Sequence, residues 1–161
     1  MRKIVWATLA AATLVSGLTG CAPQQQTLTL VQPLNSAKQE ILNQNPAGDA
    51  GDGTAFESIV EKDGKYFGGM LGTTTKVSTM PSSIVSGSEE RLLNGVFDLL
   101  DGEIIVSGIT HYNPTATRLD LLKPVTRAIT GGTGAYAGVR GEVTTTRNED
   151  DTFTHVLRMW K

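Results

Sequence analysis

Residues 128–143 read Ala-Ile-Thr-Gly-Gly-Thr-Gly-Ala-Tyr-Ala-Gly-Val-Arg-Gly-Glu-Val. Strand-favouring runs over 125–130 and 135–146 flank these glycines, so the pattern predicts a β-hairpin whose corner contains Gly131, Gly132 and Gly134. A phosphate-binding loop is the second interpretation. It lacks support, because neither a Gly-Lys-Ser/Thr ending nor a helix follows the glycines. The stretch therefore favours a fold of antiparallel strands.

Turn signals divide the rest of the chain into short strands. Asp63-Gly64 and Asp101-Gly102 favour tight hairpin turns, because these residue pairs accept positive φ. The expected strands cover residues 27–31, 54–61, 66–79, 86–99, 103–112, 125–130, 135–146 and 152–160. Residues 36–53 are expected to form a loop with at most one helical turn, and 115–123 a link of unassigned structure.

Eight expected strands with almost no room for helices predict an all-β fold. Closing about eight antiparallel strands gives a small barrel whose interior is filled by side chains or holds one small ligand. The prediction is therefore an eight-stranded antiparallel β-barrel, preceded by a signal peptide and a short tether; the family resemblance described below implies the calycin type of barrel. A sandwich of two sheets is the alternative.

The N-terminus resembles a bacterial lipoprotein signal. Arg2 and Lys3 precede an apolar run over 4–15, which is typical of a secretory signal and short for a membrane span. The run closes at Leu18-Thr19-Gly20-Cys21, which resembles a lipobox. The resemblance implies that Cys21 is lipidated and becomes the mature N-terminus. Secretion with a free thiol is the alternative.

The signal divides the chain into three parts: residues 1–20 as signal peptide, 21–50 as lipidated N-terminus, tether and possible first strand, and 51–161 as the main part of the barrel. Ala22 stands where an aspartate would resemble the inner-membrane retention signal. The expected location is therefore the cell envelope, with the protein anchored by its lipid to the outer membrane and facing the periplasm.

Composition excludes several classes of site. Cys21 is the only cysteine, so a disulfide within the chain is excluded. The formal charge is −2 and becomes −4 without the signal, which removes only the charges of Arg2 and Lys3. Such an acidic chain offers no basic surface typical of nucleic-acid binding. His111 and His155 are the only histidines, so no metal site is expected.

Several turn motifs together resemble one family. They are Gly51-Asp52, Asp63-Gly64, Phe67-Gly68, the run over 99–104 and the run over 129–141. Their order is similar to that in the barrel shared by allene oxide cyclases, dirigent proteins and bacterial relatives. The resemblance implies an eight-stranded barrel, often a homotrimer, with an apolar cavity that binds or shapes a small hydrophobic molecule without a cofactor.

Two departures from the family pattern bear on activity. Plant cyclases carry a cysteine after the glycine matched by Gly72, where this chain has Thr73 and Thr74. Dirigent proteins place an acidic residue after the arginine matched by Arg127, where this chain has Ala128. Neither specialised activity therefore transfers residue by residue.

The candidate cavity or rim residues are Glu57, Thr74, His111, Tyr112, Tyr136 and His155. His155 shares a face with apolar neighbours in its expected strand, and the pair 111–112 ends a strand where a barrel mouth is expected. Glu57 would be a plausible acid or base if it faced inward, and surface polarity if it faced outward.

Three functional hypotheses follow. The leading one is an envelope lipoprotein whose barrel binds a small hydrophobic ligand or serves as an interaction module. The second is a cofactor-independent cyclase or isomerase that folds a hydrophobic substrate in the cavity. The third is a purely structural envelope module with a packed interior. A cavity of about 300 Å3 or more favours the first two.

Overall fold

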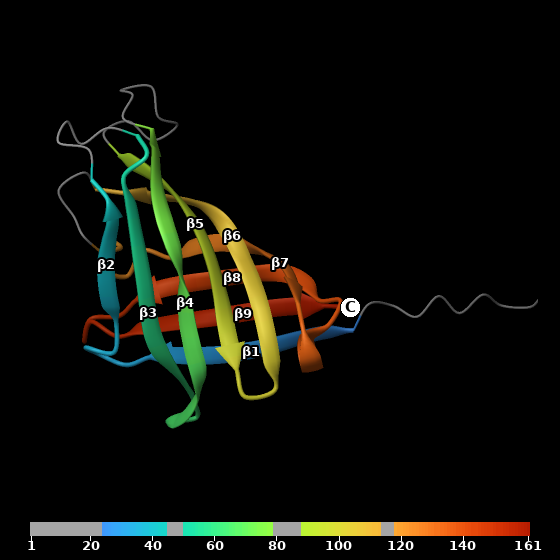
Figure 1. Cartoon of the computed structure of the whole chain (residues 1–161). Helices are drawn as coiled ribbons and strands as arrows, with labels where there is room; N and C mark the ends of the chain where they lie inside the picture. The colour runs from blue at the N-terminus through green and yellow to red at the C-terminus, as the bar shows by residue number, and fades with distance from the viewer. Residues whose placement is uncertain (1–23, 45–49, 79–87, 114–117) are drawn as a thin grey trace, which may run out of the picture.

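A computed structural model of the chain describes residues 24–44, 50–78, 88–113 and 118–161. It contains nine strands and one short 3-10 turn (Figure 1). The strands are β1 (Gln25–Gln32), β2 (Lys38–Asn43), β3 (Gly53–Lys62), β4 (Lys65–Ser78), β5 (Glu89–Leu99), β6 (Gly102–Tyr112), β7 (Val125–Gly132), β8 (Arg140–Arg147) and β9 (Phe153–Trp160), and the turn is η1 (Gly134–Tyr136).

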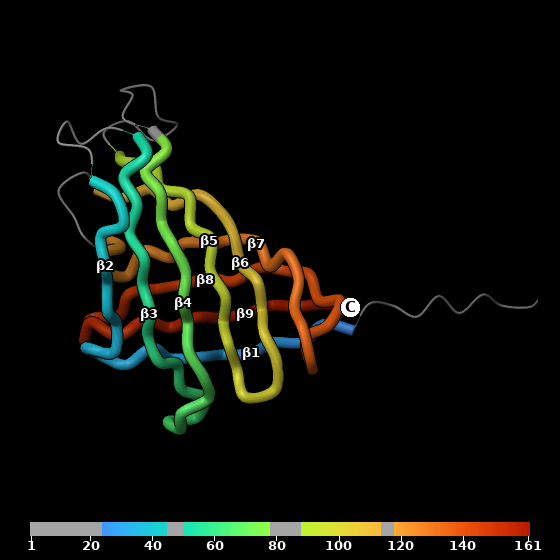
Figure 2. The backbone as a smooth tube through the Cα atoms, viewed as in Figure 1, coloured from blue at the N-terminus to red at the C-terminus, as the bar shows by residue number. Residues whose placement is uncertain are grey.

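Eight of the strands close into an antiparallel barrel, which confirms the predicted fold. Their neighbour order is β1-β9-β8-β7-β6-β5-β4-β3, and β1 meets β3 again through the pair Val31 and Glu61. In Figure 2 the backbone of β3 to β6 crosses β1, β8 and β9 steeply, as expected for strongly tilted strands around a small barrel. No α-helix occurs in the described segments.

Two segments differ from the sequence-based expectation. Residues 38–43 form β2, a strand along the first half of β3, where a loop with a helical turn was expected. All side chains of β2 are exposed, and its sequence Lys-Gln-Glu-Ile-Leu-Asn does not alternate apolar and polar residues. The segment is a strand because its backbone pairs with β3. The strand expected over 135–146 begins only at Arg140, because η1 occupies the preceding residues.

The first tight turn is confirmed: Asp63 and Gly64 have φ of 52° and 71°, the geometry of a hairpin turn with positive φ at both positions. The second turn lies one residue earlier than predicted, at Leu100-Asp101, because Leu99 pairs with Gly102. Together with the glycine stretch, these two turns lie at one end of the barrel, which we call the closed end (Figure 1). The end of β4 at Ser78 and the neighbouring ends of β5 and β6 at Glu89 and Tyr112 lie at the other end, which we call the mouth.

The glycine stretch closes this end by packing against the neighbouring turn. Tyr136 and Val139 are buried there within the core cluster. The backbone nitrogen of Ala135 donates to the carbonyl of Asp101 over 2.9 Å, and that of Thr133 donates to Glu103 over 2.9 Å. The opening motif therefore joins two hairpins at the closed end.

The adjacent glycines Gly131 and Gly132 differ in whether the surrounding backbone leaves space for a Cβ atom. A Cβ at Gly132 would lie 2.6 Å from the carbonyl oxygen of Glu103 and 2.7 Å from that of Tyr136. A Cβ at Gly131 would meet nothing closer than the end of Arg140, at 3.5 Å. Gly132 is thus required by close backbone approach and not by positive φ, whereas Gly134 has φ of 55°.

Gly132→Ala is therefore expected to lower the free energy of unfolding by about 1–3 kcal/mol, the usual cost of overpacking. Gly131→Ala is the matched control and should change it by less than about 0.5 kcal/mol. Chemical denaturation followed by circular dichroism measures both. Equal stability of the two variants would contradict the close-approach argument.

Candidate functional site

A cavity of about 650 Å3 opens at the mouth of the barrel. The apolar residues of its wall are Pro33, Leu34, Ala37, Ile41, Phe56, Met70, Leu93, Leu119 and Phe153. The polar residues are Gln32, Asn35, Gln39, Gln44, Thr54, Ser58, Thr74, Arg91, Tyr112, Arg118, Arg127, Thr145, Asp151 and His155. A cavity that combines apolar side chains with converging polar groups is suited to a small molecule that has both kinds of surface.

Arg127 points into this cavity because of strand alternation. In β7 the side chains of Val125, Arg127 and Ile129 alternate with exposed neighbours, and Ile129 lies in the core. The neighbouring strand leaves room for the arginine, since a Cβ at Gly108 would lie 3.2 Å from Cβ and Cγ of Arg127. A larger residue at position 108 would therefore crowd the base of the Arg127 side chain.

The Arg127 guanidinium is held by threonine hydroxyls and not by a carboxylate. It is 5% exposed. Its Nε and Nη2 donate to Oγ1 of Thr110 over 2.9 and 2.6 Å, and its Nη1 donates to Oγ1 of Thr145 over 3.5 Å. Among the described residues no acidic side chain pairs with it. Burial lowers the pKa of Arg127, which reflects the cost of keeping this cation out of water.

His155 continues this polar row on the next strand. Thr145 and His155 are cross-strand partners, and Oγ1 of the threonine lies 3.0 Å from Nδ1 of the histidine. The imidazole packs edge-on against Phe97, with ring centroids 5.2 Å apart. Burial, with a smaller effect of the Arg127 charge, lowers the pKa of His155 to about 3. His155 is therefore neutral at physiological pH.

Two buried polar atoms at the cavity lack a hydrogen-bond partner in the described part of the chain. They are Nε2 of His155 and Oγ of Ser58, and both residues line the cavity. Buried polar groups are nearly always paired, so a water molecule or a polar ligand atom is expected to bind at both positions.

Near the mouth the buried carboxylate of Glu89 pairs with two cations, one of which lies over a tyrosine ring. Glu89 accepts Lys76 Nζ at 3.0 Å and Arg91 Nε at 2.5 Å. Burial alone would raise the pKa of Glu89, but these two cations outweigh it and lower the pKa. The Arg91 guanidinium lies 4.5 Å from the centre of the Tyr112 ring. Burial raises the pKa of Tyr112, while Arg127 and Arg91 oppose the shift.

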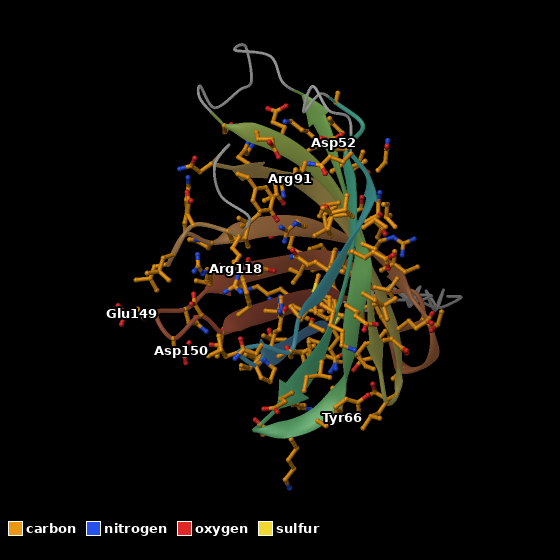
Figure 3. All side chains as sticks on the ribbon, turned by 60° about the vertical axis from the view of Figure 1, so that its left-hand side comes forward. Asp52, Tyr66, Arg91, Arg118, Glu149 and Asp150 are labelled. Carbon is orange, nitrogen blue, oxygen red and sulfur yellow. The ribbon has the colours of Figure 1, made fainter. Side chains whose placement is uncertain are left out.

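A second carboxylate at the mouth is shared between two arginines. Asp151 accepts from Nε of Arg147 over 2.8 Å and lies 3.9 Å from Arg118. Figure 3 shows Arg118 and Arg91 on the same side of the molecule, away from Tyr66 at the other end. Glu89 and Asp151 thus each serve two cations, whereas Arg127 has no carboxylate partner among the described residues. The charged side chains that line the cavity are three arginines, Arg91, Arg118 and Arg127, and one carboxylate, Asp151.

Three of the six sequence-based site candidates line the cavity and three lie elsewhere. Thr74, Tyr112 and His155 line the cavity. Glu57 does not, because its side chain is exposed on the outer face and pairs with Lys38 at 3.2 Å. His111 also faces outward, with Nδ1 at 3.7 Å from Glu90.

Tyr136 is buried at the closed end and not in the cavity. Burial and then a hydrogen bond with Asp101 raise the pKa of its phenol. Its neighbours Gly131, Gly132 and Gly134 belong to the structural corner described above.

Sequence reasoning missed Arg127, Thr145 and Ser58 as cavity residues, and Thr110 as a hydrogen-bond partner of Arg127. The signal for Arg127 was present, since the residue alternates with Val125 and Ile129 on the inward face of a strand. A charged residue in an inward row marks a functional position. The three hydroxyl residues carry no comparable signal, because threonine and serine are common on both faces of strands.

Other predicted features lie outside what the structure describes. Cys21 and the lipobox residues Leu18, Thr19 and Gly20 precede residue 24. Within the described segments no helix is sufficiently long and apolar to span a membrane. The same segments contain no group of three or more His, Cys, Asp or Glu side chains that could hold a metal ion.

Several solved protein structures contain a similar barrel. A pyocyanin demethylase shares 28% identity at a TM-score of 0.62, over 83% of this chain and 99% of that one. An exo-specific intermolecular Diels-Alderase shares 13% sequence identity at a TM-score of 0.64, and the match covers 87% of this chain and 99% of that one. A pterocarpan synthase dirigent protein shares 15% sequence identity at a TM-score of 0.59, and the match covers 95% of this chain and 96% of that one. No protein-family model and no curated protein sequence matches the chain.

These similarities confirm the fold expected from the turn motifs. The chain has the closed barrel found in a dirigent protein and in a Diels-Alderase. At 13% and 15% identity, those two likenesses show the fold alone.

The buried histidine predicts a pH dependence of stability. Its pKa is about 3 in the folded protein and 6.5 in its ordinary state, so the unfolded chain binds a proton that the folded chain excludes. Stability should therefore fall as the pH drops from 6.5 toward 3. Between pH 6.5 and 4.5 the wild type should lose about 2 kcal/mol more unfolding free energy than His155→Gln.

Urea denaturation at several pH values tests this dependence. The lowered pKa of the Glu89 carboxyl also makes stability fall at low pH, but this residue is present in both proteins, so its effect cancels in the comparison. Parallel loss of stability in both proteins would show that His155 does not carry the effect.

Proposed function

We propose that the barrel binds a small hydrophobic molecule carrying an anionic or strongly polarised oxygen, and that this oxygen is received by Arg127. The observation that carries the proposal is the guanidinium buried at the cavity, for which no residue of the described segments supplies a carboxylate partner. Its remaining N–H donors can bind an oxyanion, and charge-assisted hydrogen bonds of this kind are among the strongest in proteins. The apolar wall supplies the contact for the rest of the molecule.

The size and composition of the cavity support this proposal over the packed structural module. A volume of about 650 Å3 exceeds the roughly 300 Å3 that a small-molecule site requires. The unpaired atoms of His155 and Ser58 offer further polar contacts within the same wall. A barrel closed to ligands would have filled this space with apolar side chains.

The second candidate function is catalysis on the bound molecule, and the neighbour set favours it. The likeness to pyocyanin demethylase, at 28% identity, extends over nearly the whole of that enzyme. A guanidinium placed against a developing oxyanion lowers the barrier of reactions that pass through an enolate or phenolate. Tyr112 lies beside that cation and would serve as a hydrogen-bond donor, while neutral His155 would accept or donate through Nε2.

We further propose that the protein is a lipoprotein of the cell envelope, anchored through Cys21 to the outer membrane and facing the periplasm. The proposal rests on the lipobox-like run that ends at Cys21, after a basic and then an apolar segment. Two or three acyl chains on one residue are sufficient for stable membrane attachment.

Arg127 is tested with a matched pair of probes, 2-naphthoate and 2-naphthamide, which share a shape and differ in charge. Isothermal titration calorimetry on the wild type should show about 10-fold to 100-fold tighter binding of the carboxylate, as expected for a charge-assisted hydrogen bond worth about 1.5–3 kcal/mol. In Arg127→Gln the two probes should bind about equally.

The matched control is Arg158→Gln, which removes an exposed arginine from the outer face of β9. This variant should keep the wild-type preference for the carboxylate. Equal affinity of the wild type for both probes, or an unchanged preference in Arg127→Gln, would reject the anion-binding role.

Lipidation is tested by Cys21→Ser. In the bacterial host the wild type should fractionate with the membrane and resist extraction by high salt, because acyl chains hold it there. Cys21→Ser should be found in the soluble fraction or as uncleaved precursor, and mass spectrometry should find no acylated N-terminal peptide. An unacylated wild-type N-terminus would contradict the anchor.

A further inference from the structure

The proposed anchor would join the barrel at its closed end. β1 begins at Gln25, which pairs with Trp160 at the end of β9. Only Ala22, Pro23 and Gln24 separate Cys21 from Gln25. Four Cα–Cα steps span at most about 14 Å, so an acylated Cys21 would hold this end of the barrel close to the bilayer surface.

The same end exposes three large side chains with apolar surface. Leu100 is 70% exposed, Tyr66 59% and Trp160 42%. Leucine at a turn tip, and tyrosine and tryptophan at the boundary of apolar and polar surroundings, are the residue types that enter the interface of a bilayer. None of the three is required by the barrel core.

A path of backbone and side-chain hydrogen bonds places these residues on one end. Leu100 donates its backbone N–H to Phe67, the neighbour of Tyr66, over 3.1 Å. The adjacent Asp101 accepts the backbone N–H of Ala135, whose carbonyl accepts Nζ of Lys161 over 3.1 Å. Lys161 follows Trp160, so the path connects the three segments that carry the exposed side chains. In Figure 3 Tyr66 lies at the end opposite Arg91.

We propose that the closed end rests on the bilayer that holds the anchor, with Leu100, Tyr66 and Trp160 in the headgroup region. The inference rests on the proposed lipidation of Cys21. The mouth then opens away from the membrane, so the cavity exchanges its ligand with the aqueous compartment and not directly with the bilayer.

The charged side chains at the closed end indicate which lipid headgroups this surface can contact. Positive side chains (Lys62, Lys65, Arg140 and Lys161) and negative ones (Asp63, Asp101 and Glu103) are interspersed at the closed end. The surface is therefore not specific for anionic lipids, and a zwitterionic phosphatidylcholine bilayer is sufficient. Because the anchor raises the local concentration of the surface at the bilayer, even weak contacts become populated.

Trp160 provides a direct readout. The sequence contains only Trp6 and Trp160, and Trp6 lies in the expected signal peptide, so Trp160 would be the sole tryptophan of the mature protein. The full-length processed protein is reconstituted into phosphatidylcholine vesicles that contain a headgroup-proximal nitroxide lipid. Trp160 emission should shift to shorter wavelength and fall by about half or more, as expected for a side chain at headgroup depth.

Three variants sharpen the test. Leu100→Ser and Tyr66→Ser should leave the vesicle-bound fraction unchanged and weaken the quenching of Trp160 at least about twofold. Ile41→Ser removes an equally exposed apolar side chain from β2, beside the mouth, and should leave quenching at the wild-type level.

The outcomes separate the two proposals. Vesicle-bound protein whose Trp160 is not quenched would overturn the docking surface and leave the anchor intact. Protein that carries no acyl chain and does not bind vesicles would overturn the anchor and the docking with it. Equal effects of Ile41→Ser and Leu100→Ser would also reject the proposed orientation.

Discussion

A guanidinium buried without a counter-ion is the constraint on which the functional half of this barrel depends. Burial of a cation costs several kcal/mol unless hydrogen bonds and an opposite charge compensate it. Thr110 and Thr145 supply hydrogen bonds to Arg127, and Gly108 leaves space for its side chain. The opposite charge is missing from the described residues. We infer that a ligand supplies it, because the threonine hydroxyls provide hydrogen bonds to this cation but no opposite charge.

The barrel divides its tasks between its two ends. At the closed end, tight turns and the glycine stretch over 128–143 pack backbone against backbone, and Gly132 permits the closest approach. At the mouth, apolar side chains and polar groups that include Arg127 line a cavity, and the nearby carboxylates Glu89 and Asp151 each pair with two cations. Stability therefore depends mainly on the first end and recognition on the second, a separation that lets site residues change without loss of the fold.

Much of the fold could be predicted from local chemistry. Asp63-Gly64 takes positive φ at both positions, and the alternation of His155, Leu157 and Met159 in β9 gives three buried side chains. β2 could not be predicted, because none of its side chains is buried and only the edge of β3 defines it. The site was predicted in part: Tyr112 and His155 line the cavity, whereas Arg127 was considered only as a family marker. Convergence of strands that are distant in sequence is what brings Arg127, Thr145 and His155 together.

The unfolding free energy of Arg127→Met, without ligand and compared with the wild type, tests most directly whether this arginine is retained for binding. Replacing an unpaired buried charge by an apolar side chain of similar length removes its desolvation cost. The account predicts that the variant is as stable as the wild type or more stable by about 1–3 kcal/mol. A loss of about 3–5 kcal/mol, as for the breaking of a compensated buried network, would show that Arg127 holds the barrel together and would contradict the account.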